Sequence, residues 1–461
     1  MRWMRFVLAF VLACVAGASE VAAKLDRALQ AVPAGGRASV ALLDLTTDTW
    51  VYQRQAEQPL SLASTTKLLT AAAAFAELGP AFRFSTRVVG IGPQHGDSLS
   101  GLGIIGGGDP CLDGHFYDED PDLVFRQWAD HCKRLGIARI LGDIVIDNRL
   151  FAGPIRPETY PQDAENQQRW YSAPASAFAW NDNCIEVRMV PTVPGHPAEA
   201  QVRPHSRRIQ VRNLTRTVAG KSDSRFSVTR DGDDNILTVS GTYTKPTAWF
   251  PLAIADEPDL LAADHLKHVL ERAGIAVSGE VRIGAVEPNA GPLLIDLQHD
   301  LVPALTLMNQ HSQNFYAEQV LRQIGAHRLR QGSIDAGCKA VLEVLAPALG
   351  RSAATVSLLD GSGLSYDNRA SAEAMVTLLR AMHRSDWRDA FTSTLKSKDS
   401  GKSRGMVKTG TLAIACCLAG YVDLPSGHRL GFAILLNKGT ARDFGWASKL
   451  RESLFKIMCG G

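Results

Sequence analysis

The distribution of apolar residues divides the chain into an opening, a middle and a closing region. In the opening region, Val40 to Asp44 and Trp50 to Gln53 alternate as two strands. A short helix is expected over residues 24–33, and the Ala-rich run from Leu68 to Leu78 predicts a buried helix. The chain therefore opens with a strand hairpin that is followed by a helix.

The middle region has a different sequence pattern. From about residue 85 onward, short strand-like runs alternate with Gly, Asp and Pro turns. Residues 185–250 are richest in such runs, whereas residues 150–170 are irregular. The remaining pattern predicts helices at Pro121 to Leu135 and Leu260 to Ala273, and strands at Ile140 to Asp147 and Gly279 to Gly284.

The closing region returns to helices and ends on a strand meander. It predicts helices at Leu301 to Ile324, Ser333 to Leu349, Ala372 to Ser385 and Arg442 to Met458, and strands at Gly405 to Leu412, Ala415 to Val422 and Leu430 to Asn437. Strands flanked by the first and last helices are typical of an α+β domain whose sheet uses both chain ends. The middle region is then an insertion into that domain.

Composition changes this picture only at the N-terminus. The 461 residues favour about three domains, and a net charge of +2 gives no indication of nucleic acid or an anionic membrane surface as a partner. Arg2 and Arg5 precede an apolar run, Phe6 to Ala16, that is too short to span a bilayer. Small residues follow, so residues 1–23 are predicted to be a secretory signal peptide, with a permanent anchor as the alternative.

The mature chain is therefore expected outside the cytoplasm, in the periplasm, without a transmembrane domain. Cys14 lies in a run that weakly resembles a lipoprotein cleavage box. The seven later cysteines are odd in number, so at least one is free or pairs outside the chain. Their connectivity and the oligomeric state are left open by the sequence.

Three short motifs carry the candidate chemistry, and their order is informative. They are Ser64-Thr65-Thr66-Lys67, Ser312-Gln313-Asn314, and Lys408-Thr409-Gly410 followed by Thr411. Ser-x-x-Lys alone is weak, because Ser393 to Lys396 and Ser453 to Lys456 match it too. Those copies break the expected order, whereas the ordered triple is a strong signal of a serine acyl-transfer enzyme.

The residue types suit nucleophilic catalysis. A serine hydroxyl needs a neighbour that takes its proton, and Lys67 lies one helical turn beyond Ser64. A lysine acts as a base only with a lowered pKa, which burial and a second cation such as Lys408 would provide. Ser312 could bridge the two lysines and relay a proton to the leaving amine.

The other motif residues are candidates for substrate binding. The Asn314 amide could hold the substrate's peptide group, and a strand edge at Lys408 to Thr411, which includes Gly410, could bind an extended peptide. The backbone N–H groups of Ser64 and Thr411 are candidates for the oxyanion hole. The Thr409 and Thr411 hydroxyls could receive a C-terminal carboxylate.

The chain resembles the D-alanyl-D-alanine carboxypeptidase/endopeptidase family of low-molecular-mass penicillin-binding proteins, of the class C type, over most of the mature chain. The segments that carry the resemblance are Ala63 to Leu68, Gly106-Gly107-Gly108-Asp109-Pro110, Gly142 to Asp147, Ser312-Gln313-Asn314, Asp360-Gly361-Ser362-Gly363-Leu364-Ser365 and Val407 to Leu412. Gln313 is a mild variation, and Cys416-Cys417 after the third motif is unusual. The resemblance implies an acyl-enzyme on Ser64, peptidoglycan stem peptides ending in D-Ala-D-Ala as substrates, β-lactams as covalent inhibitors, and neither metal nor organic cofactor.

The resemblance also implies an α+β transpeptidase-like domain, related to β-lactamases, that is split by a nested insertion of two smaller domains. The catalytic domain is expected at residues 24–84 and 290–461, the inserted β-rich domain at 85–107 and 174–289, and the second nested domain at 108–173. A β-lactamase or esterase on the same fold, and a non-catalytic wall-binding protein, are the alternative functions. The 248 residues between Ser64 and Ser312 favour the peptidase over a compact β-lactamase.

Several other features of the sequence are interpreted as structural rather than functional. Gly101 to Gly106 matches a dinucleotide fingerprint, but a turn rather than a helix is predicted after it. His265 and His268 are interpreted as surface histidines, because no third metal ligand lies near them in the sequence. Asp360 and Ser362 are expected to shape a turn or cleft before any catalytic role. Arg203 to Arg208 is interpreted as a solvated charged run, with peptidoglycan binding as an alternative.

Overall fold

The computed structural model describes residues 19–220, 227–230 and 234–460. Residues 1–18 of the predicted signal peptide, including Cys14, lie outside these ranges. No helix within them is long and apolar enough to cross a membrane. The chain forms two compact units. The terminal unit comprises the chain up to Pro80, Leu305–Gln313 and the residues from Ile334 onward, and the inserted unit comprises Ala81–Ala304 and Asn314–Ser333.

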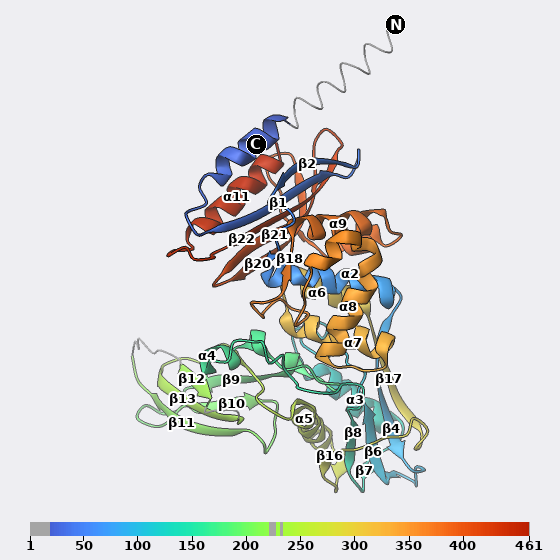
Figure 1. Ribbon diagram of the computed structural model, residues 1–461. Helices are drawn as coiled ribbons and strands as arrows, with labels where there is room; N and C mark the ends of the chain where they lie inside the picture. The colour runs from blue at the N-terminus through green and yellow to red at the C-terminus, as the bar shows by residue number, and fades with distance from the viewer. Residues whose placement is uncertain (1–18, 221–226, 231–233, 461) are drawn as a thin grey trace. The chain divides into compact units, whose positions relative to one another are not determined.

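The terminal unit is built on a six-stranded sheet in the order β19-β20-β21-β22-β1-β2 (Figure 1). β1 from the start of the chain pairs antiparallel with β22 from its end, so both ends share one sheet, as predicted. The strands are β1 Arg37–Asp44, β2 Thr49–Arg54, β19 Lys396–Ser397, β20 Arg404–Leu412, β21 Ala415–Asp423 and β22 Arg429–Asn437.

Helices cover this sheet. The first described helix, residues 19–29, lies beside α11 (Trp446–Met458), and both contribute to one apolar core with the sheet (Figure 1). α9 (Ala372–Arg384) packs on β1 and β22, and α2 packs against α8. The other elements of this unit are β3 Leu60–Ser61, η1 Ala63–Thr66, α2 Lys67–Glu77, α8 Ile334–Leu349, η4 Gly350–Thr355, β18 Arg369–Ala370 and α10 Arg388–Ser393.

The inserted unit contains a five-stranded sheet in the order β16-β8-β6-β4-β17, whose apolar core is shared with α3 and α5. These elements are β4 Arg83–Ile91, β6 Gly101–Ile105, α3 Leu123–Arg134, β8 Ile144–Asp147, α5 Pro258–Arg272, β16 Val281–Ile283 and β17 Leu293–Asp300. A smaller sheet joins β5 Ser98–Leu99, β7 Arg139–Ile140 and β15 Ala276–Val277.

The predicted β-rich stretch at 185–250 is confirmed as two three-stranded sheets around a core that includes Ile185, Val187, Leu237 and Val239. One sheet holds β9 Cys184–Val190, β10 Glu199–Arg203 and β14 Phe250–Ala253. The other holds β11 Gln210–Thr217, β12 Ser227–Arg230 and β13 Ile236–Tyr243. The finer division of the insertion into two nested domains stays a prediction.

Two predicted elements and one predicted environment need correction. His265, interpreted as a surface histidine, is buried, and its Nε2 lies 2.8 Å from Asp122 Oδ1. The single helix expected from Leu301 to Ile324 is two helices, α6 (Leu301–Gln310) and α7 (Asn314–Leu329). The chain breaks between them at Ser312, whose φ of 59° is incompatible with a right-handed helix. The single strand expected from Ile140 to Asp147 is likewise split into β7 and β8. In both cases a local turn interrupts an apolar pattern that continues through it.

Candidate active site

Ser64 and Lys67 meet at the point where η1 leads into α2. Ser64 lies within the short helix η1, and Lys67 is the first residue of α2. The Lys67 ammonium nitrogen Nζ lies 3.2 Å from Ser64 Oγ, and the lysine side chain is completely buried. Ala63, which precedes the serine, has a φ of 47°, an uncommon conformation for a residue with a side chain. The spacing of three residues thus places the predicted base against the predicted nucleophile.

Ser312 and Lys408 form a second serine–lysine contact within the same unit. Lys408 Nζ donates a 2.9 Å hydrogen bond to Ser312 Oγ and another to the Thr409 carbonyl. Lys408 is buried on β20, and Ser312 reaches it from the left-handed turn between α6 and α7. The break in the predicted long helix therefore places the Ser312 hydroxyl against Lys408.

Two buried lysines in one unit are electrostatically unfavourable. Burial, and then the neighbouring charge of Lys67, lowers the pKa of Lys408 well below its usual range. Interacting ammonium groups titrate as a pair, so the first proton leaves more readily than it would from an isolated lysine. Both effects favour the loss of a proton from the lysine pair, which a lysine base requires.

The Asp360 to Ser365 segment forms the turn that the sequence predicted, and it contacts Lys67, which the sequence did not predict. The Asp360 carboxylate is fully buried and accepts hydrogen bonds from the backbone N–H groups of Ser362, Gly363 and Ser365. The turn so formed directs the Ser362 carbonyl to Lys67 Nζ, at 2.6 Å. Lys67 therefore has a fixed acceptor as well as Ser64, and this holds its amine in place.

Burial raises the pKa of the Asp360 carboxyl, while the hydrogen bonds from the turn and the Lys67 charge act in the opposite direction. Thr70 on α2 adds a further link, because its hydroxyl donates to the Gly361 carbonyl at 2.7 Å. A Gly-rich run before an Asn or Ser indicates a turn in the sequence. Only the fold shows which side chain that turn faces.

β20 passes close to η1 at Gly410. A Cβ atom added at Gly410 would lie 2.8 Å from the Leu62 carbonyl oxygen and 2.9 Å from the backbone nitrogens of both Ser64 and Thr65. Real Cβ atoms essentially never approach backbone so closely. Glycine is therefore required for the helix that carries Ser64 to lie against the strand that carries Lys408.

The outer edge of β20 is only partly covered. β19 pairs with Met406 and Val407, and no other described strand continues along that edge from Lys408 to Leu412. The Thr409 and Thr411 side chains are exposed. The predicted edge for binding an extended peptide is thus present at the third motif.

Asn314 is the one predicted site residue that belongs to the inserted unit. It is the first residue of α7 and is buried, and its amide Nδ2 donates to the Tyr171 carbonyl at 2.9 Å. Within that unit the amide group is therefore held in one orientation. The other predicted residues, Ser64, Lys67, Ser312, Lys408, Thr409, Gly410 and Thr411, all belong to the terminal unit.

The two extra Ser-x-x-Lys matches lack this environment. Ser393 ends α10 and donates its hydroxyl to the Ala390 carbonyl, while Lys396 is exposed on β19. Lys456 on α11 is exposed as well. An exposed lysine keeps its solvation, so neither copy provides the buried base that Lys67 offers.

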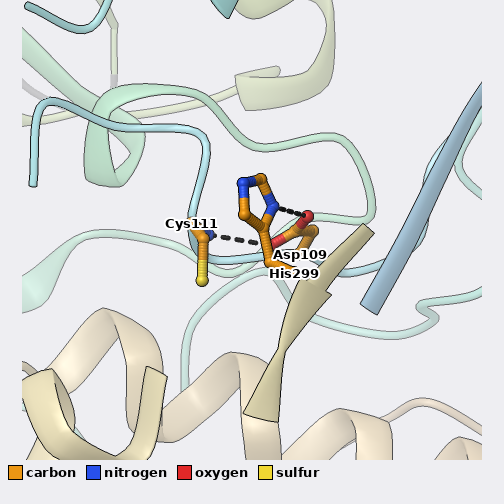
Figure 2. Close-up of side chains that lie close together, drawn as sticks. All are labelled: Asp109, Cys111 and His299. Carbon is orange, nitrogen blue, oxygen red and sulfur yellow. Dashed lines mark hydrogen bonds and ion pairs between the residues drawn. The ribbon is translucent and has the colours of Figure 1, made fainter. Parts of the chain in front are cut away.

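Two groups of side chains in the described part of the inserted unit have spacings that a metal ion could use: Asp109, Cys111 and His299, and Asp113, His115 and Asp182. Figure 2 shows the first group. The Asp109 carboxylate accepts from the Cys111 N–H and lies 2.6 Å from His299 Nδ1, while His299 Nε2 lies 3.1 Å from the Tyr117 hydroxyl. Both carboxylate oxygens and both ring nitrogens are thus engaged, which fits a structural network that fixes the Gly-rich turn before Pro110.

The profile of the D-Ala-D-Ala carboxypeptidase 3 (S13) family matches residues 21–445 of the chain. The D-alanyl-D-alanine carboxypeptidase of Actinomadura sp. (strain R39) is 29% identical over 436 residues, covering 87% of this chain and 78% of the relative. The crystal structure of penicillin binding protein 4 (dacB) from Haemophilus influenzae is similar with a TM-score of 0.75 and 23% identity, covering 94% of this chain and 98% of its own. The complex of that protein with a novel β-lactam gives a TM-score of 0.72 and 22% identity, covering 94% and 99%.

Proposed function

The chain belongs to the D-Ala-D-Ala carboxypeptidase 3 (S13) family, and from this premise we propose that Ser64 is its acylated nucleophile. As a member of that family it is a serine-type D-Ala-D-Ala carboxypeptidase that acts on peptidoglycan. The observation that carries the assignment of residues is the pair of buried lysines, one against each of two serines. Burial of two lysines costs free energy of folding, and a non-catalytic wall-binding protein would gain nothing from it.

In the proposed reaction Ser64 Oγ attacks the carbonyl carbon of the penultimate D-Ala. Neutral Lys67 takes the hydroxyl proton as the new C–O bond forms. When the bond to the terminal D-Ala nitrogen breaks, the proton that Lys67 took passes through Ser312, which is bonded to Lys408, to that nitrogen, and Lys67 is neutral again. Water then attacks the ester carbonyl while neutral Lys67 takes its proton. Lys67 returns that proton to Ser64 Oγ as the ester C–O bond breaks and the shortened peptide leaves.

The backbone N–H groups of Ser64 and Thr411 are proposed as the oxyanion hole. The close approach at Gly410 supports this, because it brings the Ser64 nitrogen alongside the strand that carries Thr411. Donors fixed in this way stabilise the charge that develops on the substrate's carbonyl oxygen. The exposed Thr409 and Thr411 hydroxyls are proposed to receive the C-terminal carboxylate, and the buried Asn314 amide to hold the substrate's peptide group.

β-Lactams are proposed as slow, covalent inhibitors, and cross-linked stem peptides as additional substrates. A β-lactam presents a strained amide to the same nucleophile, and a β-lactam complex exists for the Haemophilus influenzae structure. We place the protein in the periplasm after removal of residues 1–23, on the basis of the charged start and the short apolar run.

The test is the intact mass of the full chain after incubation with penicillin. Wild-type protein should gain one drug mass, and Ser64→Ala should gain none. Ser393→Ala is the matched control, because it removes the serine of an exposed Ser-x-x-Lys copy and should be acylated like wild type. An adduct on Ser64→Ala would refute the assignment, and rapid steady-state destruction of penicillin would favour the β-lactamase alternative.

A further inference from the structure

The inserted unit contains a pocket of ligand size, with a volume of about 630 Å³. It lies between α3, α5 and the end of β10, and Trp249 completes its wall. All of its lining residues belong to the inserted unit. It includes Arg203 and His205, from the charged run for which peptidoglycan binding was an alternative interpretation.

Cations outnumber carboxylates among the residues that line the pocket. Four of its lining residues are Arg or Lys and two are Asp. The Asp122 carboxylate is already bonded to His265 at 2.8 Å, and Asp130 pairs with Lys133 at 2.8 Å. Three of the four cations likewise have a carboxylate partner: Lys133 has Asp130, Arg126 has Asp120 at 2.6 Å, and Arg203 has Glu186.

Arg272 is the cation that remains available. It is exposed on the last turn of α5, and no carboxylate among the described residues lies within ion-pair distance of its guanidinium. By contrast, Arg203 is paired with Glu186 at 2.5 Å and lies over the Trp249 ring at 4.4 Å. A guanidinium presents a fork of N–H donors that matches a carboxylate.

His205 and the α5 residue His268 lie together in the pocket lining. The rings of His205 and His268 lie 3.9 Å apart between centroids. Burial, followed by the charges of His205, His265 and Arg272, lowers the pKa of His268.

Part of the pocket lining is apolar. Val202, Val269 and Ala273 line it together with the half-buried Trp249. A ligand that contacts both Arg272 and these apolar side chains has a carboxylate and a small aliphatic group close together. The C-terminal alanine of a peptide has this combination, with its methyl group one bond from the carbon that carries the carboxylate.

We propose that this pocket is a second binding site for peptides of the cell wall, which it takes by a C-terminal carboxylate bound to Arg272 and an adjacent aliphatic side chain against the apolar wall. The identity of the ligand rests on the proposed function, whereas the anion site rests on the pocket itself. A second site of this kind raises the local concentration of wall peptides at the enzyme, because wall material carries many of them on one strand.

The experiment uses the full chain with Ser64 acylated by penicillin, so that residual binding reports the pocket. Isothermal titration calorimetry would measure binding of a D-Ala-D-Ala-terminated pentapeptide and of the same peptide as its C-terminal amide. The peptide acid should bind to the wild-type pocket. Binding of the amide to the wild type, and of the acid to Arg272→Ala, should each be about tenfold weaker or more, as expected for loss of a charge-assisted hydrogen bond. Arg134→Ala, which removes an exposed arginine of α3 outside the pocket, should leave binding unchanged.

Absence of residual binding, or equal binding by Arg272→Ala and wild type, would overturn the proposal. Competition by inorganic phosphate at the same concentration as the peptide would also overturn it, since the pocket would then be an unselective anion site. Failure of the proposed function is visible separately, as absence of the penicillin adduct by mass. In that event the comparison of Arg272→Ala with Arg134→Ala on untreated protein still decides the role of the pocket.

Discussion

Gly410→Ala tests whether the distance between η1 and β20 controls catalysis. The new methyl carbon would lie 2.9 Å from the Ser64 nitrogen, whereas ordinary contact begins at 3.4 Å. Its neighbours at 2.8 and 2.9 Å are all backbone atoms, so no side-chain rotation can relieve the overlap. The helix and the strand must instead separate by about 0.5 Å, which is the tolerance within which catalytic groups must be held.

We expect acylation by penicillin to slow by about tenfold to a hundredfold, because a misplacement of 1 Å costs about a hundredfold. Stability should fall by only about 1–3 kcal/mol, the usual cost of one surplus methyl group in a packed region. Stopped-flow acylation gives the rate, and thermal unfolding gives the stability. The loss of rate should persist at temperatures where the variant is fully folded.

Gly431→Ala is the matched control for this change. Gly431 lies on β22 of the same sheet, and a Cβ there would meet only Leu45 side-chain carbons, at 3.3 to 3.5 Å. A leucine side chain can adjust by that amount, so acylation should stay at the wild-type rate. If Gly410→Ala were also acylated at the wild-type rate, the proposed oxyanion role of the Ser64 N–H would be refuted.

Three further predictions concern Ser312, the lysine pair and Asp259. Ser312→Gly and Ser312→Ala should both slow acylation, but only Ser312→Gly should retain wild-type thermal stability, because glycine tolerates a φ of 59°. Acylation should accelerate as pH rises, with a midpoint well below the usual lysine range, because burial and Lys67 lower the pKa of Lys408; a flat stopped-flow pH profile would contradict this. Burial raises the pKa of Asp259 to about 6 from 3.8, so the folded state binds that proton more tightly and gains stability as pH falls through 6. Urea unfolding should therefore show Asp259→Asn to be more stable than wild type at pH 8, by at most ~3 kcal/mol, with no gain at pH 4.

The sheet and the nucleophile were predictable because their signals are local. Alternation marks the strands, and the Ser64–Lys67 spacing fixes two side chains on one helical turn. Even the use of both chain ends in one sheet followed from the order of the predicted elements. The order of the three motifs made the site predictable as well. It excluded both extra Ser-x-x-Lys copies, whose lysines are exposed in the structure.

The remainder was not predictable because it depends on contacts between distant residues. The run from Leu301 to Ile324 keeps a helical pattern across Ser312, and its one proline, Pro303, lies in the first turn rather than at the break. The left-handed turn there is supported by the hydrogen bond to Lys408, which lies 96 residues away in the sequence. In the same way the Asp360 turn is visible in the sequence, but the contact between Ser362 and Lys67 spans 295 residues.

The three motifs share a physical property beyond their chemistry. Each contains or adjoins a residue whose backbone is strained or crowded: Ala63 and Ser312 have a positive φ, and Gly410 lies against the backbone of η1. None of these positions would be stable alone, so each persists because the other segments of the terminal unit hold it. Small changes at any of them should therefore lower the acylation rate by a larger factor than they lower the folded fraction. For this reason the rate and the stability must be measured together on Gly410→Ala and on the Ser312 variants.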